Sequence, residues 1–278
     1  MATSNLASGP LHLGGVPEYF NLPWHLAMES PATDGLDLEW NDQLGGTGEM
    51  LAGLADGSLD IVSILTEGTI SATAEGLDVT IMQVYVSSPL EWGVFVPASS
   101  DLTSEDELAG RPIAISRHGS GSHLIVYILA EAKGWALPED QFVVTGGLEG
   151  ARQSFAAGES EVFLWDRFMT RPLVDAGEFR QLGTFPTPWP SFVIAARTEV
   201  LTGRTVEVGR LVDTVVAEAT ALHARSSVVE EIMARYGLDA ETTKGWLAST
   251  TFAPRQPMDP DLGESVLAAL KRAGFVSE

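Results

Sequence analysis

The stretch GGTGEMLAGLADGSLDIVSILTEG, residues 45–68, decides the fold class of this chain. Apolar residues recur at helical spacing over 46–57, and Gly57 suits the C-terminal cap of that helix. The apolar run 60–65 predicts a buried strand, and a second helix is expected over 67–76. Strands and helices therefore alternate, with glycine and threonine where one element gives way to the next.

The same alternation continues on both sides of this stretch. It predicts an α/β fold with largely parallel sheets. Two segments break the pattern: 87–97, where Pro89 argues against one uninterrupted central strand, and 186–197, where three prolines predict a stiff extended connection. We expect two α/β lobes joined by two crossovers. Lobe 1 comprises residues 1–88 plus 192–278, including the C-terminal helices, and lobe 2 comprises residues 89–191.

Some segments outside the quoted stretch have less regular patterns. Residues 103–110 predict a short helix in which Ser104 and Glu107 are spaced as a capping box. Residues 166–177 predict a helix interrupted by Pro172.

Composition excludes several classes of protein. The 278 residues include 16 Lys and Arg against 38 Asp and Glu, so the net charge is −22 and nucleic acid and anionic membranes are poor partners. The absence of cysteine excludes disulfides, zinc–thiolate sites and thiol nucleophiles. The five histidines show no recognised metal spacing, and Walker A and GxSxG motifs are absent, so we expect no metal and no cofactor.

The location of the protein is predicted from what the sequence lacks. No stretch approaches the ~18 consecutive apolar residues of a membrane-spanning helix. The N-terminus MATSNLASGPLHLGG has neither the basic nor the apolar region of a signal peptide. We therefore expect a soluble protein that is cytoplasmic as written, and periplasmic or extracellular if the chain is a processed form.

The loop SRHGSGSH, residues 116–123, is the first candidate binding segment. It precedes an apolar helical pattern, and helix N-termini offer unpaired N–H groups and partial positive charge to polar ligands. The alternative is a serine-capped helix after a flexible turn. The candidate ligand-binding residues here are Arg117, Gly119, Ser120, Gly121, Ser122 and His123.

Other candidates lie at further strand ends, where open α/β sheets bind ligands. Gly46 and Thr47, and then Thr66 and Glu67, stand at predicted helix starts in lobe 1, where ordinary capping explains them equally well. Trp165 and Asp166 end a strand of lobe 2, and Asp166 also suits a helix cap. The predicted hinge consists of Ser88, Pro89, Trp92, Pro188, Trp189 and Pro190.

Several of these motifs, in this order, resemble a known family. GGVPEYFNLPWHLA, YVSSPLEWG, ISRHGSGSHL and TPWPSFVIAAR, with the stretch quoted first, resemble proteins of the type II periplasmic-binding-protein fold. These relatives include the nitrate-, sulfonate- and taurine-binding proteins and the thiamine-pyrimidine synthases. The nearest resemblance is to soluble proteins of fungi and bacteria labelled as thiamine-biosynthesis or ABC-transporter substrate-binding proteins.

The resemblance implies a Venus-flytrap that closes on a ligand between its lobes. It also implies ligand contacts from Asn21, Trp24, Gly46, Thr47, Thr66, Glu67, the loop 119–123 and Trp165. The thiamine-pyrimidine synthases use a cysteine-rich motif and a donated histidine. This chain has no cysteine, so it departs from that pattern.

The favoured function is therefore a protein that binds a small polar or heteroaromatic metabolite in the cleft between the lobes. An ABC permease is the expected partner if the chain is exported. The alternative is a cytosolic enzyme on the same scaffold, acting on a small metabolite related to the thiamine pyrimidine or similar, with Glu67, His123 or Asp166 as acid or base. An interaction module without a ligand leaves three glycine-rich strand-end loops unexplained.

Overall fold

The computed structural model describes residues 9–276 and divides the chain into two compact units. The first unit contains the described residues up to Ser88 together with Pro190–Gly263. The second contains Pro89–Trp189 and the described residues from Glu264 onward. Lobe 1 is expected to contain all C-terminal helices, whereas this division puts most of the last helix in the second unit. The prediction about a signal peptide concerned the N-terminal segment 1–15, and residues 1–8 of it lie outside the described residues.

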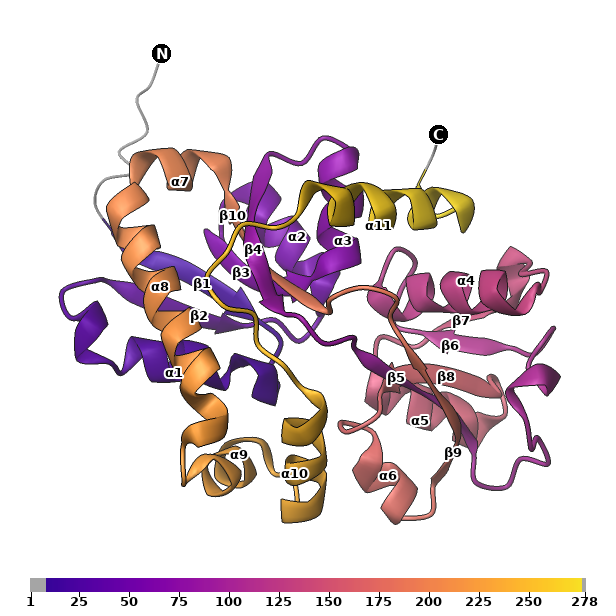
Figure 1. Cartoon of the computed structure of the whole chain (residues 1–278). Coiled ribbons are helices and arrows are strands. Elements are labelled where there is room, and N and C mark those ends of the chain that lie inside the picture. The colour runs from indigo at the N-terminus through magenta and orange to yellow at the C-terminus, as the bar shows by residue number, and fades with distance from the viewer. Residues whose placement is uncertain (1–8, 277–278) are drawn as a thin grey trace. The chain divides into compact units, whose positions relative to one another are not determined.

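The first unit is a five-stranded sheet covered by helices (Figure 1). The strand order is β2-β1-β3-β10-β4, in which β1 pairs in parallel with β2 and β3, whereas β10 is antiparallel to β3 and β4. Its strands are β1 (Leu11–Gly15), β2 (Leu38–Asp42), β3 (Ile61–Leu65), β4 (Val79–Val86) and β10 (Phe192–Arg197). Its helices are α1 (Leu22–Met28), α2 (Thr47–Asp56), α3 (Thr66–Ala74), α7 (Thr198–Gly203), α8 (Thr205–Ala221), α9 (Val228–Tyr236) and α10 (Ala240–Ser249), with short 3-10 turns η1 (Tyr19–Asn21), η2 (Pro31–Thr33) and η5 (Leu222–Ala224).

The second unit repeats this arrangement with different strands (Figure 1). The order is β7-β6-β8-β5-β9, and here β6 pairs in parallel with β7 and β8 while β5 is antiparallel to β8 and β9. Its strands are β5 (Glu91–Pro97), β6 (Ile113–Ile115), β7 (Phe142–Val144), β8 (Val162–Asp166) and β9 (Phe179–Pro186). Its helices are α4 (Gly121–Lys133), α5 (Leu148–Ala157) and α6 (Arg171–Asp175), with 3-10 turns η3 (Glu105–Glu107) and η4 (Glu139–Gln141). Helix α11 (Pro260–Arg272) begins in the first unit and continues into the second.

Each sheet therefore places its antiparallel strand fourth in the order. The other four strands of each sheet run in one direction, so the sheets are largely parallel as expected, with one reversed strand each that was not predicted. The two segments interpreted as crossovers lie where the chain passes between the units, and each also contains one of these reversed strands. Pro89 lies just before β5, so the apolar residues after it form an uninterrupted strand with partners on both sides. The prolines of 186–190 likewise end before β10 begins at Phe192.

Two shorter predictions also need correction. The segment 103–110 forms only the 3-10 turn η3, although the predicted capping box between Ser104 and Glu107 is present. The segment 166–177 forms a turn and then the short helix α6, because Pro172 fits only the first turn of a helix.

Apolar side chains pack between each sheet and the helices that cover it. In the first unit a core cluster joins α2 to the sheet: Met50, Leu54, Leu59, Val62, Ile64, Val79, Val193 and Ala195. In the second, Phe95, Ala114, Ala151, Phe155, Phe163 and Phe179 form the equivalent cluster around α5. Large buried side chains of this kind contribute ~1.5–3 kcal/mol each to folding, so the core stability of each unit comes from these contacts.

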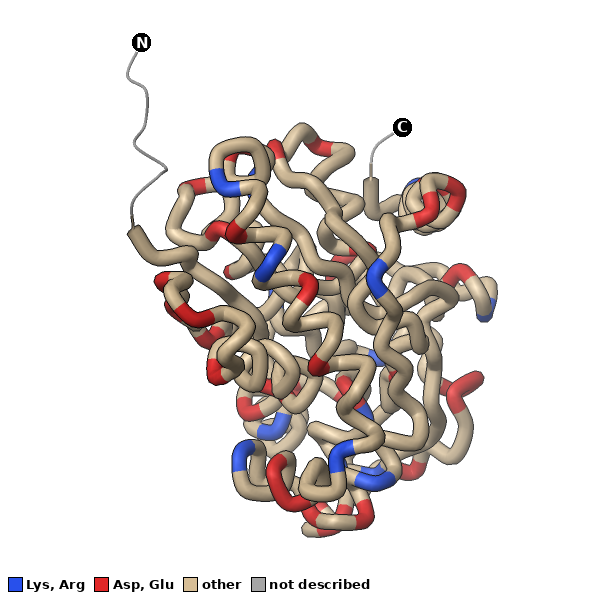
Figure 2. Tube along the Cα trace, turned by 60° about the vertical axis from the view of Figure 1, so that its left-hand side comes forward, with Lys and Arg blue, Asp and Glu red and all other residues tan. Residues whose placement is uncertain are grey.

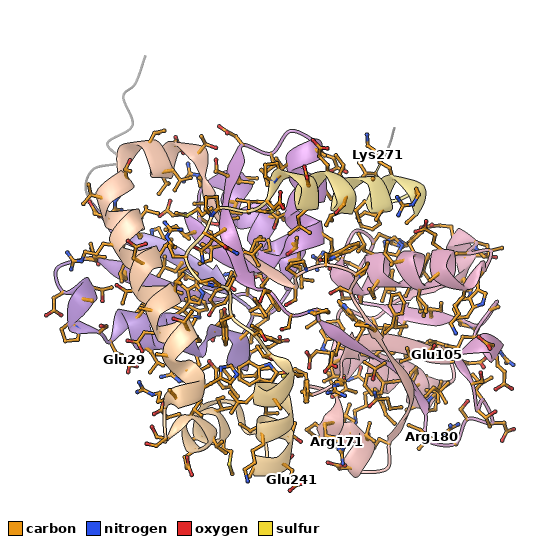
Figure 3. All side chains as sticks on the ribbon, viewed as in Figure 1. Glu29, Glu105, Arg171, Arg180, Glu241 and Lys271 are labelled. Atoms are coloured by element: carbon orange, nitrogen blue, oxygen red, sulfur yellow. The ribbon has the colours of Figure 1, made fainter. Side chains whose placement is uncertain are left out.

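Acidic residues outnumber basic ones and are distributed along the whole chain (Figure 2). Some are paired: Lys133 Nζ lies 3.3 Å from Glu105, one of the residues labelled in Figure 3, and 2.9 Å from Asp106. Among the described residues no helix is long and apolar enough to cross a membrane.

Candidate functional site

The carboxyl end of the first unit's sheet brings the starts of α2 and α3 together. Helix α3 begins at Thr66, directly after β3, and α2 begins at Thr47 after Gly46, whose φ is +66°. A Cβ on Gly68 would lie 2.4 Å from the Cγ2 of Thr47. Glycine at 68 therefore allows the two helix N-termini to approach, and this concentrates their N–H groups at one edge of the sheet.

Asn21 ends the 3-10 turn η1, which follows strand β1, the neighbour of β3 in the sheet. Its side chain closely approaches Gly15, the last residue of β1, because a Cβ there would lie 2.6 Å from Nδ2. Nδ2 donates to the carbonyl of Val16 at 2.7 Å, whereas Oδ1 has no hydrogen-bond partner among the described residues. Asn21 is 1% exposed, so this acceptor is also shielded from water.

Two further predicted site residues have the same property. Trp24 and Thr66 are 0% exposed, and neither Trp24 Nε1 nor Thr66 Oγ1 has a partner within the described chain. Trp24 follows Asn21 in α1, with its ring 5.9 Å from that of Trp40 and 6.2 Å from that of Tyr85. Buried polar groups are nearly always hydrogen-bonded, and an unsatisfied one commonly marks a bound molecule or functional site. These three atoms are therefore the strongest signal for a ligand in the first unit.

Glu67 is buried at the same helix start. It is 1% exposed and stands in the first turn of α3, where the helix dipole favours a negative charge. Asn21, Trp24, Thr66 and Glu67 are thus all at most 1% exposed, and a ligand that bound them would have to enter while they are uncovered.

The serine loop of the second unit has a different character. Ser120 Oγ accepts the N–H of His123 at 3.2 Å and so caps α4. Ser122 Oγ accepts the N–H of Ser116 at 2.9 Å and lies 3.0 Å from Ser120 Oγ. The hydroxyls thus bond to the loop itself, which is what the capped-turn alternative describes. The ligand role of Arg117, Gly119, Ser120, Gly121 and Ser122 stays a prediction.

His123 is the exception within this loop. Its ring is 7% exposed and lies 4.5 Å from that of Phe142 and 5.0 Å from that of Tyr127. Nδ1 accepts the N–H of Gly119 at 3.1 Å, while Nε2 has no hydrogen-bond partner in the described chain. Burial and the nearby His118 lower the pKa of His123 to about 4, so the ring is neutral near pH 7.

The remaining strand-end candidates have mainly structural contacts. Asp166 Oδ1 accepts the N–H groups of Phe168 at 2.8 Å and Met169 at 2.9 Å, which is a capping role for the turn after β8. The Trp165 ring stacks on that of Phe163 at 5.2 Å. Neither observation assigns these two residues to a ligand.

The division between the two units falls at the predicted hinge residues, after Ser88 and after Trp189. The carbonyl of Ser88 accepts both the N–H and the hydroxyl of Ser191, at 3.1 and 2.9 Å. Pro89, Pro188 and Pro190 flank these junctions. Trp92, however, is a strand residue inside β5, where it pairs with Asp166 and Phe185.

Sequence reasoning missed three buried polar groups of the first unit: Ser63 Oγ, Tyr236 OH and Trp246 Nε1 lack partners within the described residues. Ser63 could have been noticed, because it is a single polar residue inside the apolar run of β3. Tyr236 and Trp246 belong to α9 and α10, and no local pattern links those helices to the sheet.

Comparisons with known proteins agree with this architecture. Residues 92–185 match the family model described as Ca3427-like PBP. The CA3427 gene product of Candida albicans, described as defining a new family with the generic periplasmic binding protein structural fold, is 27% identical with a TM-score of 0.90, over 98% of this chain and 92% of that chain. Among curated proteins, none matches the chain.

Two sulfonate-binding proteins are similar at lower identity. The alkanesulfonate-binding protein SsuA of Xanthomonas axonopodis pv. citri, bound to MOPS, has 18% identity and a TM-score of 0.78, over 98% of this chain and 96% of that chain. The periplasmic aliphatic sulphonate binding protein SsuA of Escherichia coli has 18% identity and a TM-score of 0.74, over 98% and 95%. The predicted periplasmic-binding-protein fold is confirmed.

Proposed function

We propose that this protein binds a small molecule at the carboxyl end of the first unit's sheet. The observation that carries the proposal is the set of three buried polar atoms without partners: Asn21 Oδ1, Trp24 Nε1 and Thr66 Oγ1. They come from the segments that follow β1 and β3, two adjacent strands. Adjacent strand ends are where open α/β sheets hold their ligands.

The chemistry of these atoms limits the ligand. The Trp24 indole N–H only donates, the Asn21 carbonyl only accepts, and the Thr66 hydroxyl does either. A ligand that satisfies all three carries at least one acceptor and one donor. The nearby helix N-termini favour an electron-rich group on it. A small polar or heteroaromatic metabolite meets these requirements, and the solute-binding proteins of the same fold support this class of function.

Three finer features belong to this proposal as expectations of the resemblance: Venus-flytrap closure, a link to thiamine biosynthesis and an ABC permease partner. The movement required to uncover Asn21, Trp24 and Thr66 supports the first. The location of the protein, cytoplasmic or exported, follows from whether such a permease is the partner. The enzyme alternative named Glu67, His123 and Asp166 as acid or base. Two of these have contacts that suit a structural role, since Asp166 caps a turn and His123 Nδ1 accepts a backbone N–H.

The experiment begins with native mass spectrometry of freshly purified protein, to detect a trapped ligand and identify it after denaturation. A thermal-shift panel of sulfonates, pyrimidines and aromatic acids follows. A ligand at ~100 times its Kd stabilises the folded state by about 2.7 kcal/mol, which a melting curve resolves. If the protein carries no ligand and no compound shifts its Tm, small-molecule binding is refuted.

A matched pair of variants then tests the site. Trp24→Phe removes an indole N–H that has no protein partner, whereas Trp40→Phe removes one that donates to Asp42 at 2.8 Å. Both make the same change in neighbouring rings. We expect Trp24→Phe to weaken ligand binding about tenfold and Trp40→Phe to change it less than about twofold. Equal effects of the two substitutions would place the ligand elsewhere.

A further inference from the structure

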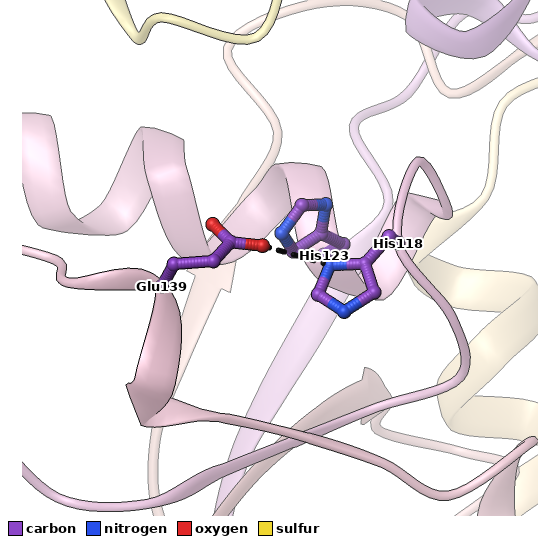
Figure 4. A group of neighbouring side chains, drawn as sticks. All are labelled: His118, His123 and Glu139. Carbon is purple, nitrogen blue, oxygen red and sulfur yellow. Dashed lines mark ion pairs between the residues drawn. The ribbon is translucent and has the colours of Figure 1, made fainter.

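Three metal-ligating side chains converge in the second unit: His118, His123 and Glu139 (Figure 4). Each offers one ligand atom, and these atoms all lie within 4.8 Å of one another. His118 Nδ1 is 3.1 Å from Glu139 Oε1. None of the three belongs to the proposed small-molecule site, so the group requires its own explanation.

The fold positions these residues from three separate segments. His118 lies in the turn after β6, His123 in the first turn of α4, and Glu139 opens the 3-10 turn η4 before β7. The rings of Phe142, Tyr127 and Phe275 surround His123 at centroid distances of 4.5, 5.0 and 5.8 Å. This aromatic packing holds the buried imidazole, while His118 and Glu139 are exposed and able to rotate.

His123 supplies an independent indication of a ligand. It is 7% exposed, and its Nε2 has no hydrogen-bond partner among the described residues. A buried polar atom without a partner is uncommon. Here that atom belongs to a residue whose neighbours within the group are a second imidazole and a carboxylate.

We propose that His118, His123 and Glu139 bind a divalent transition-metal ion of the zinc class, with water completing the coordination. Two imidazoles and one carboxylate suit Zn²⁺ and its neighbours Co²⁺, Ni²⁺ and Cu²⁺, whereas Mg²⁺ and Ca²⁺ require mostly oxygen ligands. Ligands of tetrahedral zinc at 2.0–2.2 Å are about 3.3 Å apart. The pair at 3.1 Å is close to this spacing, and rotation of the two exposed side chains brings in the third.

Metal binding requires a change of tautomer at His123. The N–H of Gly119 donates to Nδ1 at 3.1 Å, so the proton of the neutral ring is on Nε2. An ion that binds Nε2 needs that proton on Nδ1, where it would face the N–H of Gly119. The Gly119 amide must therefore turn away. Gly119 has a φ of +78° and open space around its Cβ position, so the backbone has room to move.

The bound ion would link the loop after β6 to the segment before β7. The ion would therefore restrain the loop that contains the hydrogen bonds among Ser116, Ser120 and Ser122, here called the serine network. Two measurable consequences follow. Zinc raises the Tm of the protein, by about 5 °C at ~100 times its Kd. Zinc also shifts the Gly119 amide resonance, which no metal bound elsewhere on the acidic surface would do.

The test is calorimetric titration of ZnCl₂ into untagged, chelator-treated protein, together with an amide NMR spectrum at each step. His118→Ala and Glu139→Gln change exposed side chains, so both variants are expected to fold. The control is Glu39→Gln, which removes a carboxylate 3.3 Å from His12 in a pair with no third ligand among the described residues. We expect one equivalent of Zn²⁺ in the wild type, at least a tenfold weaker Kd in His118→Ala and Glu139→Gln, and no change in Glu39→Gln.

Three results would overturn the proposal. The first is the absence of a one-equivalent zinc phase in the wild type. The second is equal zinc affinity in the wild type, His118→Ala and Glu139→Gln. The third is a Gly119 amide that stays in place when zinc is bound. None of these outcomes bears on the small-molecule site, because its residues belong to other segments.

Discussion

The two units differ in how hydroxyl groups are hydrogen-bonded at the point where a helix follows a strand. In the second unit the loop 116–123 is rich in serine and glycine, yet its hydroxyls bond to one another and to backbone N–H groups of the same loop. In the first unit the junction of β3 and α3 has a plain sequence, LTEG, yet Thr66 keeps a buried hydroxyl without a partner in the described chain. Residue types that suit ligand binding therefore do not establish it. The unsatisfied atom is the better indicator.

The largest expected effect concerns the close approach of α2 and α3. In Gly68→Ala the new methyl group would collide with Thr47 Cγ2 at 2.4 Å, and we expect the free energy of unfolding to fall by about 2–3 kcal/mol. Adding Thr47→Ser removes that methyl and should recover most of the loss. Urea unfolding of the single and double variants gives the interaction free energy between positions 47 and 68. A double variant no more stable than Gly68→Ala would show that the contact is not responsible.

Breaking the serine network should lower the free energy of unfolding by nearly as much as Gly68→Ala does. Ser122→Ala leaves the buried N–H of Ser116 without its 2.9 Å acceptor, so we expect a loss of about 2 kcal/mol. Substituting Ser227, an exposed serine whose hydroxyl donates to Glu231, provides a surface control that should cost less than about 0.5 kcal/mol. Small-molecule binding should survive Ser122→Ala once the protein is folded. Loss of binding in a folded Ser122→Ala protein would restore the serine loop as a ligand cradle.

A smaller effect is expected from pH. The pKa of His123 in the folded, metal-free protein is about 4, against an ordinary value of 6.5. The unfolded chain therefore takes up a proton that the folded chain refuses as the pH falls from 6.5 towards 4, and stability declines over that window. Allowing for solvent near the loop, the decline from this residue is about 2 kcal/mol.

His123→Phe keeps a ring in the aromatic cluster and removes the titration. The pH dependence of unfolding in this variant should be shallower between pH 6.5 and 4, whatever its absolute stability. His118, Glu139 and Tyr127 face the same ring and stay unchanged in the comparison. Parallel curves for wild type and variant would mean that His123 titrates normally.

The sequence predicted the alternation of elements well, because helical and strand periodicities are local properties. It also predicted Asn21, Trp24 and Thr66 as ligand contacts, Asn21 and Trp24 through the resemblance. Their buried polar atoms lack partners in the described chain, and the ligand role itself stays a prediction. The sequence did not predict the antiparallel strands β5 and β10, since pairing direction depends on where the chain returns from the other unit. No run of residues encodes that return.

The group of His118, His123 and Glu139 shows a second limit of prediction from sequence. His118 and His123 are close in sequence, but Glu139 is separated from them by the whole of α4. Their convergence depends on packing, so motif spacing alone indicated no metal site. The serine loop shows the opposite limit: its composition is visible in the sequence, whereas the hydrogen bonds within the loop are not, and its ligand role stays a prediction.

The most direct test of the central claim compares two buried threonines of the same helix. Thr66 Oγ1 has no partner in the described chain, whereas Thr69 Oγ1 donates to the carbonyl of Leu65 at 2.9 Å, and both residues are 0% exposed. The measurement is the Kd of the identified ligand for Thr66→Val and Thr69→Val, with unfolding free energies alongside. We predict that Thr66→Val leaves stability unchanged and weakens binding about tenfold, while Thr69→Val costs about 1 kcal/mol of stability and binds normally. Normal binding by Thr66→Val would contradict the account.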